Sequence, residues 1–202
     1  VCSSDLTEGV ILLNGIDIRK YRYDEYMDIF SVVFQDFKLF ALPLGQNVAT
    51  AQHYDVARAA DCLQKAGFSD RLARMPKGLD TCLYKDLDED GVTISGGEAQ
   101  KIAIARALYK DAPFIVLDEP TAALDPVAEA EIYAKFNEIA GDKTAIYISH
   151  RLSSCKFCDE IAVFDHGEVV QQGTHEELLG EPDGKYYELW NAQAQYYTEE
   201  SA

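Results

Sequence analysis

Short apolar runs bounded by turn residues mark the strands that the sequence predicts. These runs share apolar or β-branched side chains, and they cover 9–13, 31–34, 114–117, 144–149 and 161–164. The first run ends at Asn14-Gly15, a dipeptide typical of a tight hairpin turn. The run Phe114-Ile115-Val116-Leu117 is unbroken, as expected of a strand that is covered on both faces.

Helical periodicity fills much of the chain between these runs. Apolar positions spaced at i, i+4 and i+7 are occupied by Val56, Ala60 and Leu63. Asp55 can cap the start of this helix and Gly67 can close its end. The helical pattern continues to Lys110, which predicts a helical block from Asp55 onward.

Another helix is expected after Asp125-Pro126, where an N-cap residue precedes a proline at the first helical position. The positions that form its apolar face are Ile132, Phe136 and Ile139. The alternation of strands and helices predicts an α/β fold, with a mainly parallel sheet and helices on both faces. A helical subdomain is inserted at about 53–110, and the N-terminal hairpin is a small antiparallel β element.

The charge balance argues against one class of partner. The 202 residues include 18 Lys and Arg against 35 Asp and Glu, so the net charge is −17 and phosphate backbones of nucleic acids are repelled. Nucleotide binding stays possible, because Mg²⁺ and local backbone N–H groups can overcome an unfavourable overall field. No apolar run approaches the roughly 20 residues that cross a bilayer, so we expect a soluble segment.

Cys155 and Cys158, spaced C-x-x-C, are interpreted as small apolar residues in a reducing compartment.

Two short motifs carry candidate chemistry. Ser95-Gly96-Gly97 directly precedes a predicted helix over 98–109, which places backbone N–H groups at a positive helix end and creates an anion site; the alternative is an ordinary capped loop. Asp118 and Glu119 follow the buried strand 114–117, at the sheet edge where α/β proteins bind ligands. Asp118 would hold Mg²⁺, usually through water, and Glu119 would orient or deprotonate an attacking water. The alternative here is a strand end with two solvated carboxylates.

The order of five motifs resembles the nucleotide-binding domain of ABC transporters over 7–197. Gln35 in Val-Val-Phe-Gln-Asp resembles the Q-loop, 94–107 the ABC signature, 114–119 the Walker B motif, 123–125 the D-loop and Ser149-His150 the switch-histidine loop. Glu98 stands where the family more often has glutamine, and this places a negative charge beside a phosphate-facing loop unless the residue caps the helix.

The resemblance implies a role for each of these residues. Two such domains would pair head to tail and enclose two ATP molecules, with Ser95, Gly96 and Gly97 on the γ-phosphate of the partner's ATP. Gln35 would contact Mg²⁺ and the attacking water, while Asp118 would hold the metal through water. Glu119 would be the general base and His150 would contact the γ-phosphate. Asp125 would lie at the dimer interface and link the two ATP sites.

One expected element is absent from the sequence. No G-x-x-x-x-G-K-[ST] pattern occurs, and the only Gly-Lys pair, Gly184-Lys185, is followed by Tyr186. We therefore expect that the first P-loop β–α unit is missing and that the segment alone is inactive as an ATPase. Residues 1–6 resemble the translation of a sequencing adapter, so the protein's own sequence is expected to begin at Thr7, with 198–202 as a tail.

Further motifs are similar to those of exporters. They are Glu89-Asp90-Gly91 ahead of the signature, Phe37-Lys38-Leu39-Phe40 after the Q-loop and the ending Gly184-Lys185-Tyr186-Tyr187-Glu188-Leu189-Trp190. In exporters a transmembrane domain precedes the ATPase domain in the same chain, which implies a location at the cytoplasmic face of the cell membrane. The alternatives are the ATPase subunit of an ABC importer and a non-transport ABC ATPase, and the net charge of −17 argues against the second.

The DNA upstream of Thr7 provides the first test. Long reads through this junction are expected to encode a Gly-rich loop ending in Gly-Lys-Ser/Thr, preceded by about six apolar segments of ~20 residues. A reading frame that opens at Val1 with no such loop upstream would instead indicate a paralogue that cannot hydrolyse ATP.

Overall fold

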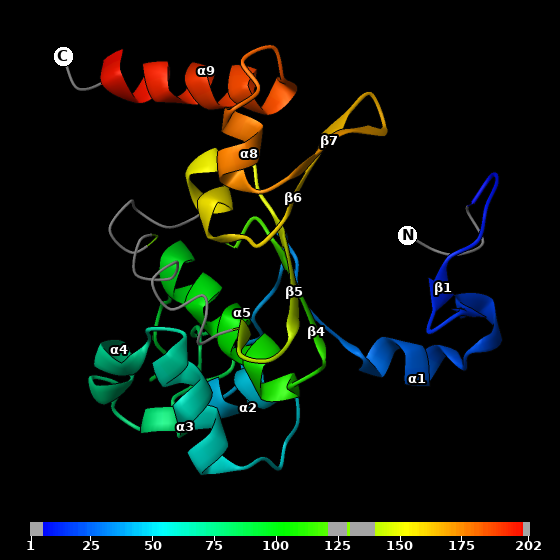
Figure 1. The fold of residues 1–202 in the computed structure, drawn as a ribbon. Coiled ribbons are helices and arrows are strands. Elements are labelled where there is room, and N and C mark those ends of the chain that lie inside the picture. Colours follow the sequence, from blue (N-terminus) through cyan, green and yellow to red (C-terminus); the bar gives the residue numbers. More distant parts are fainter. Residues whose placement is uncertain (1–5, 121–128, 130–139, 200–202) are drawn as a thin grey trace. The chain divides into compact units, whose positions relative to one another are not determined.

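The computed structural model describes residues 6–120, 129 and 140–199. The chain divides into two compact units, Val1–Tyr147 and Ile148–Ala202, and each is described by itself (Figure 1). The helix predicted after Asp125-Pro126, including Ile132, Phe136 and Ile139, lies outside the described residues. Within the described residues, no helix has the length and apolar content that a membrane span requires.

The N-terminal hairpin forms where the sequence predicts it. Strands β1 (Leu12–Leu13) and β2 (Ile16–Asp17) pair antiparallel. Asn14 and Gly15 between them both have positive φ, 51° and 76°. A two-residue turn of this hand matches the twist of the flanking strands, which is why Asn-Gly favours it. The 3₁₀ helix η2 (Ile18–Lys20) and helix α1 (Tyr23–Asp28) follow.

Three strands form the central sheet of the first unit, in the order β3, β4, β5. These strands are β3 (Phe30–Val33), β4 (Phe114–Asp118) and β5 (Thr144–Ile148). β3 and β4 run parallel, with Val33 opposite Leu117. Burial along β4 alternates: Ile115 and Leu117 are each 1% exposed, whereas Phe114 and Val116 are half-buried. The strand is thus covered on both faces, as expected, but unequally: Ile115 and Leu117 pack into the core, whereas Phe114 and Val116 are only partly covered.

The helical block lies between β3 and β4 in the chain. It contains α2 (Leu44–Ala49), α3 (Val56–Lys65), α4 (Ser69–Ala73), η3 (Gly78–Asp80) and α5 (Gly96–Lys110). Helices α2 and α3 both pack on α5, and α5 also packs on β3. An extended stretch interrupts the block, with bridges from Cys82 to Pro43 and from Leu83 to Val92. The helical block predicted over 55–110 therefore also contains an extended stretch that the periodicity did not indicate.

Helix α3 shows which part of the periodicity argument holds. The Asp55 side chain accepts a hydrogen bond from Arg58 N, and Gly67 beyond the helix has φ +74°, as its capping role requires. Leu63 is fully buried, but Val56 is 63% exposed. The buried face consists of Ala59, Cys62, Leu63 and Ala66. The core face therefore begins at Ala59 rather than at Val56, because contact with α5 decides the rotation of the helix.

The second unit has its own small core. Strands β6 (Ile161–Asp165) and β7 (Glu168–Gly173) form an antiparallel hairpin whose turn residues, His166 and Gly167, both have positive φ. The 3₁₀ helix η4 (Leu152–Phe157) and helices α8 (His175–Leu179) and α9 (Lys185–Glu199) accompany it. The buried residues of this core are Ile161, Val163, Leu178 and Tyr186.

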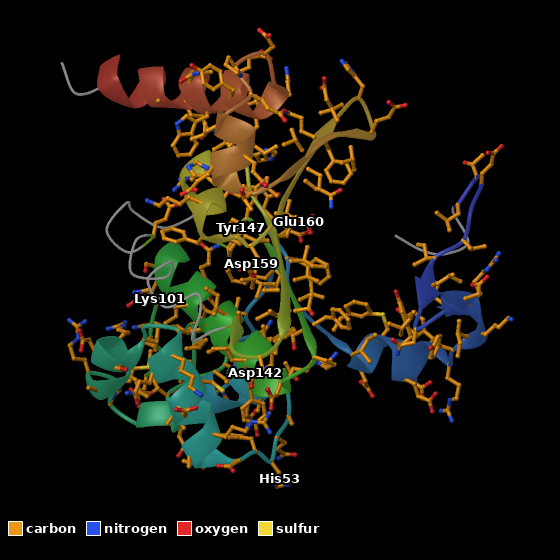
Figure 2. All side chains as sticks on the ribbon, viewed as in Figure 1. His53, Lys101, Asp142, Tyr147, Asp159 and Glu160 are labelled. Carbon is orange, nitrogen blue, oxygen red and sulfur yellow. The ribbon has the colours of Figure 1, made fainter. Side chains whose placement is uncertain are left out.

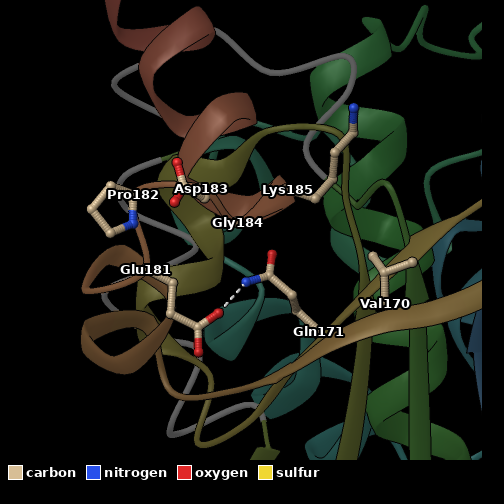
Figure 3. A pocket seen from close by; sticks show the side chains of 7 residues that line it. All are labelled: Val170, Gln171, Glu181, Pro182, Asp183, Gly184 and Lys185. Atoms are coloured by element: carbon tan, nitrogen blue, oxygen red, sulfur yellow. Dashed lines mark hydrogen bonds between the residues drawn. The ribbon is translucent and has the colours of Figure 1, made fainter.

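Polar contacts connect the hairpin of the second unit to the turn before α9. Gln171 donates to Glu181 and accepts a hydrogen bond from Tyr186 N at 2.8 Å, beside a pocket lined by Val170 and residues 181–185 (Figure 3). Burial raises the pKa of the Cys155 thiol to about 11 and also raises that of Cys158. These two thiols are therefore protonated, weakly nucleophilic groups near neutral pH.

Truncation of Leu63 tests the assignment of the core. Leu63→Ala in this chain should lower the free energy of unfolding by about 2–5 kcal/mol, because it leaves a cavity against α5. Val56→Ala on the same helix should change this free energy by less than about 0.5 kcal/mol. Urea denaturation followed by circular dichroism would measure both. Equal effects of the two substitutions would contradict the burial pattern of α3.

Candidate active site

Two strand ends bring Gln35 and Glu119 together. Because β3 and β4 are parallel with Val33 opposite Leu117, the residues two positions further on lie at the same edge of the sheet. Gln35 Nε2 donates a hydrogen bond to Glu119 Oε2 at 3.1 Å. The two residues are 84 positions apart in the sequence, yet this contact joins the residues predicted to be the Q-loop amide and the general base.

The main chain at Glu119 has an uncommon conformation. Its φ is +47°, in the left-handed region that side chains other than glycine rarely adopt. The carbonyl of Glu119 accepts a hydrogen bond from Gln100 Nε2 at 3.0 Å. Gln100 comes from α5 and is only 3% exposed. This buried amide therefore holds the turn that directs the Glu119 carboxylate.

Gln100 was missed by the reasoning from sequence. It lies within the signature helix, where the sequence assigned roles only to the loop residues Ser95, Gly96 and Gly97. The available signal was a polar side chain on the helical face of the apolar Ala103 and Ile104, since an amide buried on such a face requires hydrogen-bond partners. Which partner it would find could not be predicted, because Glu119 is 19 residues away.

The groups at this edge suit a magnesium ion. Asp118 ends β4 and is half-buried, and Gln35 adds an amide oxygen at the end of the neighbouring strand. Mg²⁺ takes oxygen ligands and is usually bound through one or two protein groups, with water and phosphate completing its shell. Among the described residues no cluster of three or more His, Cys, Asp or Glu side chains could form an all-protein cage. The donor set fits a metal that reaches the site together with a phosphate.

Ser95 begins α5 with a full capping box. Its hydroxyl accepts a hydrogen bond from Glu98 N at 3.3 Å, and Glu98 Oε2 accepts one from Ser95 N at 2.9 Å. The N–H groups of Gly96 and Gly97 are not used by this box, and Ser95 and Gly96 are exposed. The 15-residue helix thus presents its positive end to solvent, as an anion site requires. The expectation that Glu98 caps the helix is confirmed.

His150 and Asp125 are the two remaining predicted residues. His150 follows β5, belongs to the second unit and is exposed, and its carbonyl accepts a hydrogen bond from Gln193 Nε2 of α9. Asp125 lies outside the described residues. The structure therefore brings Gln35 and Glu119 together beside Asp118 in the first unit, and the roles of His150 and Asp125 stay predictions.

Comparison with known proteins identifies the family. A sequence profile described as "ABC transporter" matches residues 2–122, which is more than half of the chain. The chain belongs to the ABC transporter family. The order of motifs in its sequence had predicted this membership.

Relatives in the ABC transporter family extend beyond the chain. An ATP-dependent lipid A-core flippase of Idiomarina loihiensis is 41% identical over 194 residues, which are 94% of this chain and 32% of the relative. The flippase of Vibrio cholerae is 38% identical over 191 residues, again 94% of this chain and 32% of the relative. The chain thus spans about a third of the length of the curated relatives it matches.

A solved structure supports the fold class. The structure of a bacterial Atm1-family ABC exporter with ATP bound matches 93% of this chain and 32% of its own, with 36% identity and a TM-score of 0.83. The predicted ABC ATPase fold, with a parallel sheet, a helical subdomain and small antiparallel elements, is confirmed.

Removing the donor at Gln100 tests its control of Glu119. Gln100→Leu should lower the free energy of unfolding of the chain by about 1–3 kcal/mol, because the part-buried Glu119 carbonyl loses a donor. Lys101→Ala, at the neighbouring position of α5 labelled in Figure 2, should have a much smaller effect because Lys101 is half-exposed. Equilibrium denaturation would compare the two. A Gln100→Leu chain as stable as the Lys101→Ala chain would show that the amide does not hold the turn.

Proposed function

We propose that this chain provides the ATP-hydrolysing machinery of an ABC exporter. The observation that supports it most is the hydrogen bond from Gln35 to the Glu119 carboxylate, at the sheet edge that also carries Asp118. A carboxylate that is oriented by an amide, beside a second carboxylate suited to magnesium, is an arrangement that can activate water for phosphoryl transfer.

Each residue then has a defined task. Glu119 orients the attacking water and accepts its proton, while Gln35 holds the Glu119 carboxylate in place and offers its amide oxygen to water or metal. Asp118 holds Mg²⁺ through water. The metal, when bound, neutralises charge on the phosphates of ATP. His150 contacts the γ-phosphate.

The exposed end of α5 acts on a second nucleotide. Ser95, Gly96 and Gly97 bind the γ-phosphate of the ATP that a second ABC ATPase domain holds, in a head-to-tail dimer. Asp125 lies at the interface and links the two sites. The unused N–H groups at this helix start support the assignment, because they favour a negatively charged ligand.

The relatives support export and a membrane partner. The matched proteins are named flippases and an exporter, and this chain spans about a third of their length. We infer that a transmembrane domain lies upstream in the same polypeptide and that the ATPase domain works at the cytoplasmic face of the cell membrane. We assign export but no particular cargo, because flippases and an Atm1-family exporter match this chain at similar identities, 41% and 36%.

Substitution of Glu119 tests the proposed chemistry. In the full-length protein that carries this chain, Glu119→Gln should lower ATP turnover by about 10²–10⁴-fold, because the amide cannot accept the proton of water. Ser95→Arg should have a comparable effect, since a large side chain blocks the start of α5. Phosphate release is the measurement.

The matched control is Glu25→Gln. Glu25 lies on α1, and its substitution also removes one carboxylate charge. The ATP turnover of the Glu25→Gln variant should stay within about twofold of that of the unmodified protein. Near-normal turnover of Glu119→Gln or Ser95→Arg would contradict the site assignment.

A further inference from the structure

Glu98 poses an electrostatic problem at the start of α5. Its carboxylate lies in the first helical turn, beside the loop that would bind the γ-phosphate of ATP. A negative side chain in this turn offsets the positive end of the helix and repels a phosphate. The chain already carries a net charge of −17, so its overall field does not relieve this repulsion.

Arg71 faces this carboxylate from another helix. It lies on α4, and its Nε is 2.8 Å from Glu98 Oε1. The Nε atom is buried and makes no hydrogen bond within the described residues, so the contact with Glu98 is one of opposite charges. The two side chains are 30% and 26% exposed, which reduces the screening by water.

A second contact of Arg71 fixes the chain just before the loop. Arg71 Nη2 donates a hydrogen bond to Thr93 O at 3.3 Å. Glu98 divides its oxygens, with Oε2 on Ser95 N at 2.9 Å and Oε1 toward Arg71. Arg71 is therefore connected to both sides of the Ser95 to Gly97 segment, through the backbone before it and the carboxylate after it.

The other cation near Glu98 along the helix points elsewhere. Lys101 lies three residues further on α5, and its Nζ would be 3.7 Å from a Cβ placed at Gly67. Figure 2 shows Lys101 on the α5 helix. Lys101 thus lies over the turn after α3, whereas the ion pair of Glu98 is formed with Arg71.

We propose that Arg71 is a positioning residue for ATP binding at the signature loop. It neutralises Glu98 and holds that carboxylate on the Ser95 backbone, so that the start of α5 keeps its affinity for phosphate. This role rests on the proposed function, since it needs ATP at the Ser95 to Gly97 segment. Arg71 lies on α4, outside the signature motif of residues 94–107, so the motif alone does not reveal this residue.

Loss of the positive charge should weaken ATP binding more than it slows chemistry. In the full-length protein, Arg71→Ala should raise the KM for ATP by about three- to tenfold with little change in kcat, because an unpaired carboxylate repels the phosphate in the ground state and the transition state alike. Higher ionic strength should reduce this increase, because salt screens the Glu98 charge. A purely structural role of Arg71 would not produce this salt dependence.

A double-mutant cycle separates charge from structure. Glu98→Gln keeps an oxygen that can cap Ser95 N but removes the charge, so Arg71→Ala combined with Glu98→Gln should restore the KM to within about twofold. Arg71→Gln, which can still donate to Thr93 O, should raise the KM as Arg71→Ala does and replaces it if that variant does not fold. The matched control is Arg74→Ala. Arg74 is the C-cap residue of the same helix, and its side chain donates a hydrogen bond to Asp70 O.

The outcomes distinguish this proposal from the proposed function. If the KM stays high in the double variant, or if Arg71→Ala and Arg71→Gln leave it unchanged, Arg71 does not act by neutralising Glu98. Glu119→Gln is assayed in parallel. Normal turnover of Glu119→Gln would overturn the proposed function itself. If Glu119→Gln abolishes turnover while the Arg71 variants keep the KM of the unmodified protein, only the role of Arg71 is overturned.

Discussion

Parallel pairing of β3 with β4 is the constraint on which the candidate site depends. The register that sets Val33 against Leu117 also sets Gln35 against Glu119, two residues beyond each strand. A parallel connection needs a crossover, and here the crossover contains the whole helical block from α2 to α5. The packing of α5 from that block on β3 therefore helps to decide whether the amide reaches the carboxylate.

Helix α5 connects the parts of the site. Its N-cap is Ser95, its second turn places Gln100 on the Glu119 carbonyl, and its later turns place Arg106 on the carbonyls of Asn47 and Lys38. Lys38 lies three residues after Gln35, so one helix contacts the main chain at both strand ends. Burial lowers the pKa of Arg106, but its guanidinium stays charged near neutral pH.

The charges at the start of α5 differ from the overall charge of this chain. A net charge of −17 would be expected to repel a nucleotide, yet the start of α5 offers backbone N–H groups, and Arg71 offsets the carboxylate closest to them. Exposed charges separated by more than about a Debye length, roughly 8–10 Å, are largely screened, whereas the half-buried Arg71–Glu98 contact is not. Binding of an anion at the start of α5 would therefore depend on groups within a few ångströms of it rather than on the net charge.

The sequence by itself determined the elements whose causes are local. Asn14-Gly15 sets the hairpin turn, Asp55 caps α3, and Ser95 with Glu98 forms a capping box, since each depends on residues within three or four positions. The order of motifs was likewise enough to predict the family. Tertiary structure alone decided that α3 buries Ala59 rather than Val56, that Gln100 donates to the Glu119 carbonyl and that Arg71 pairs with Glu98. These contacts join residues from different elements, and no local pattern encodes the rotation or register that brings them together.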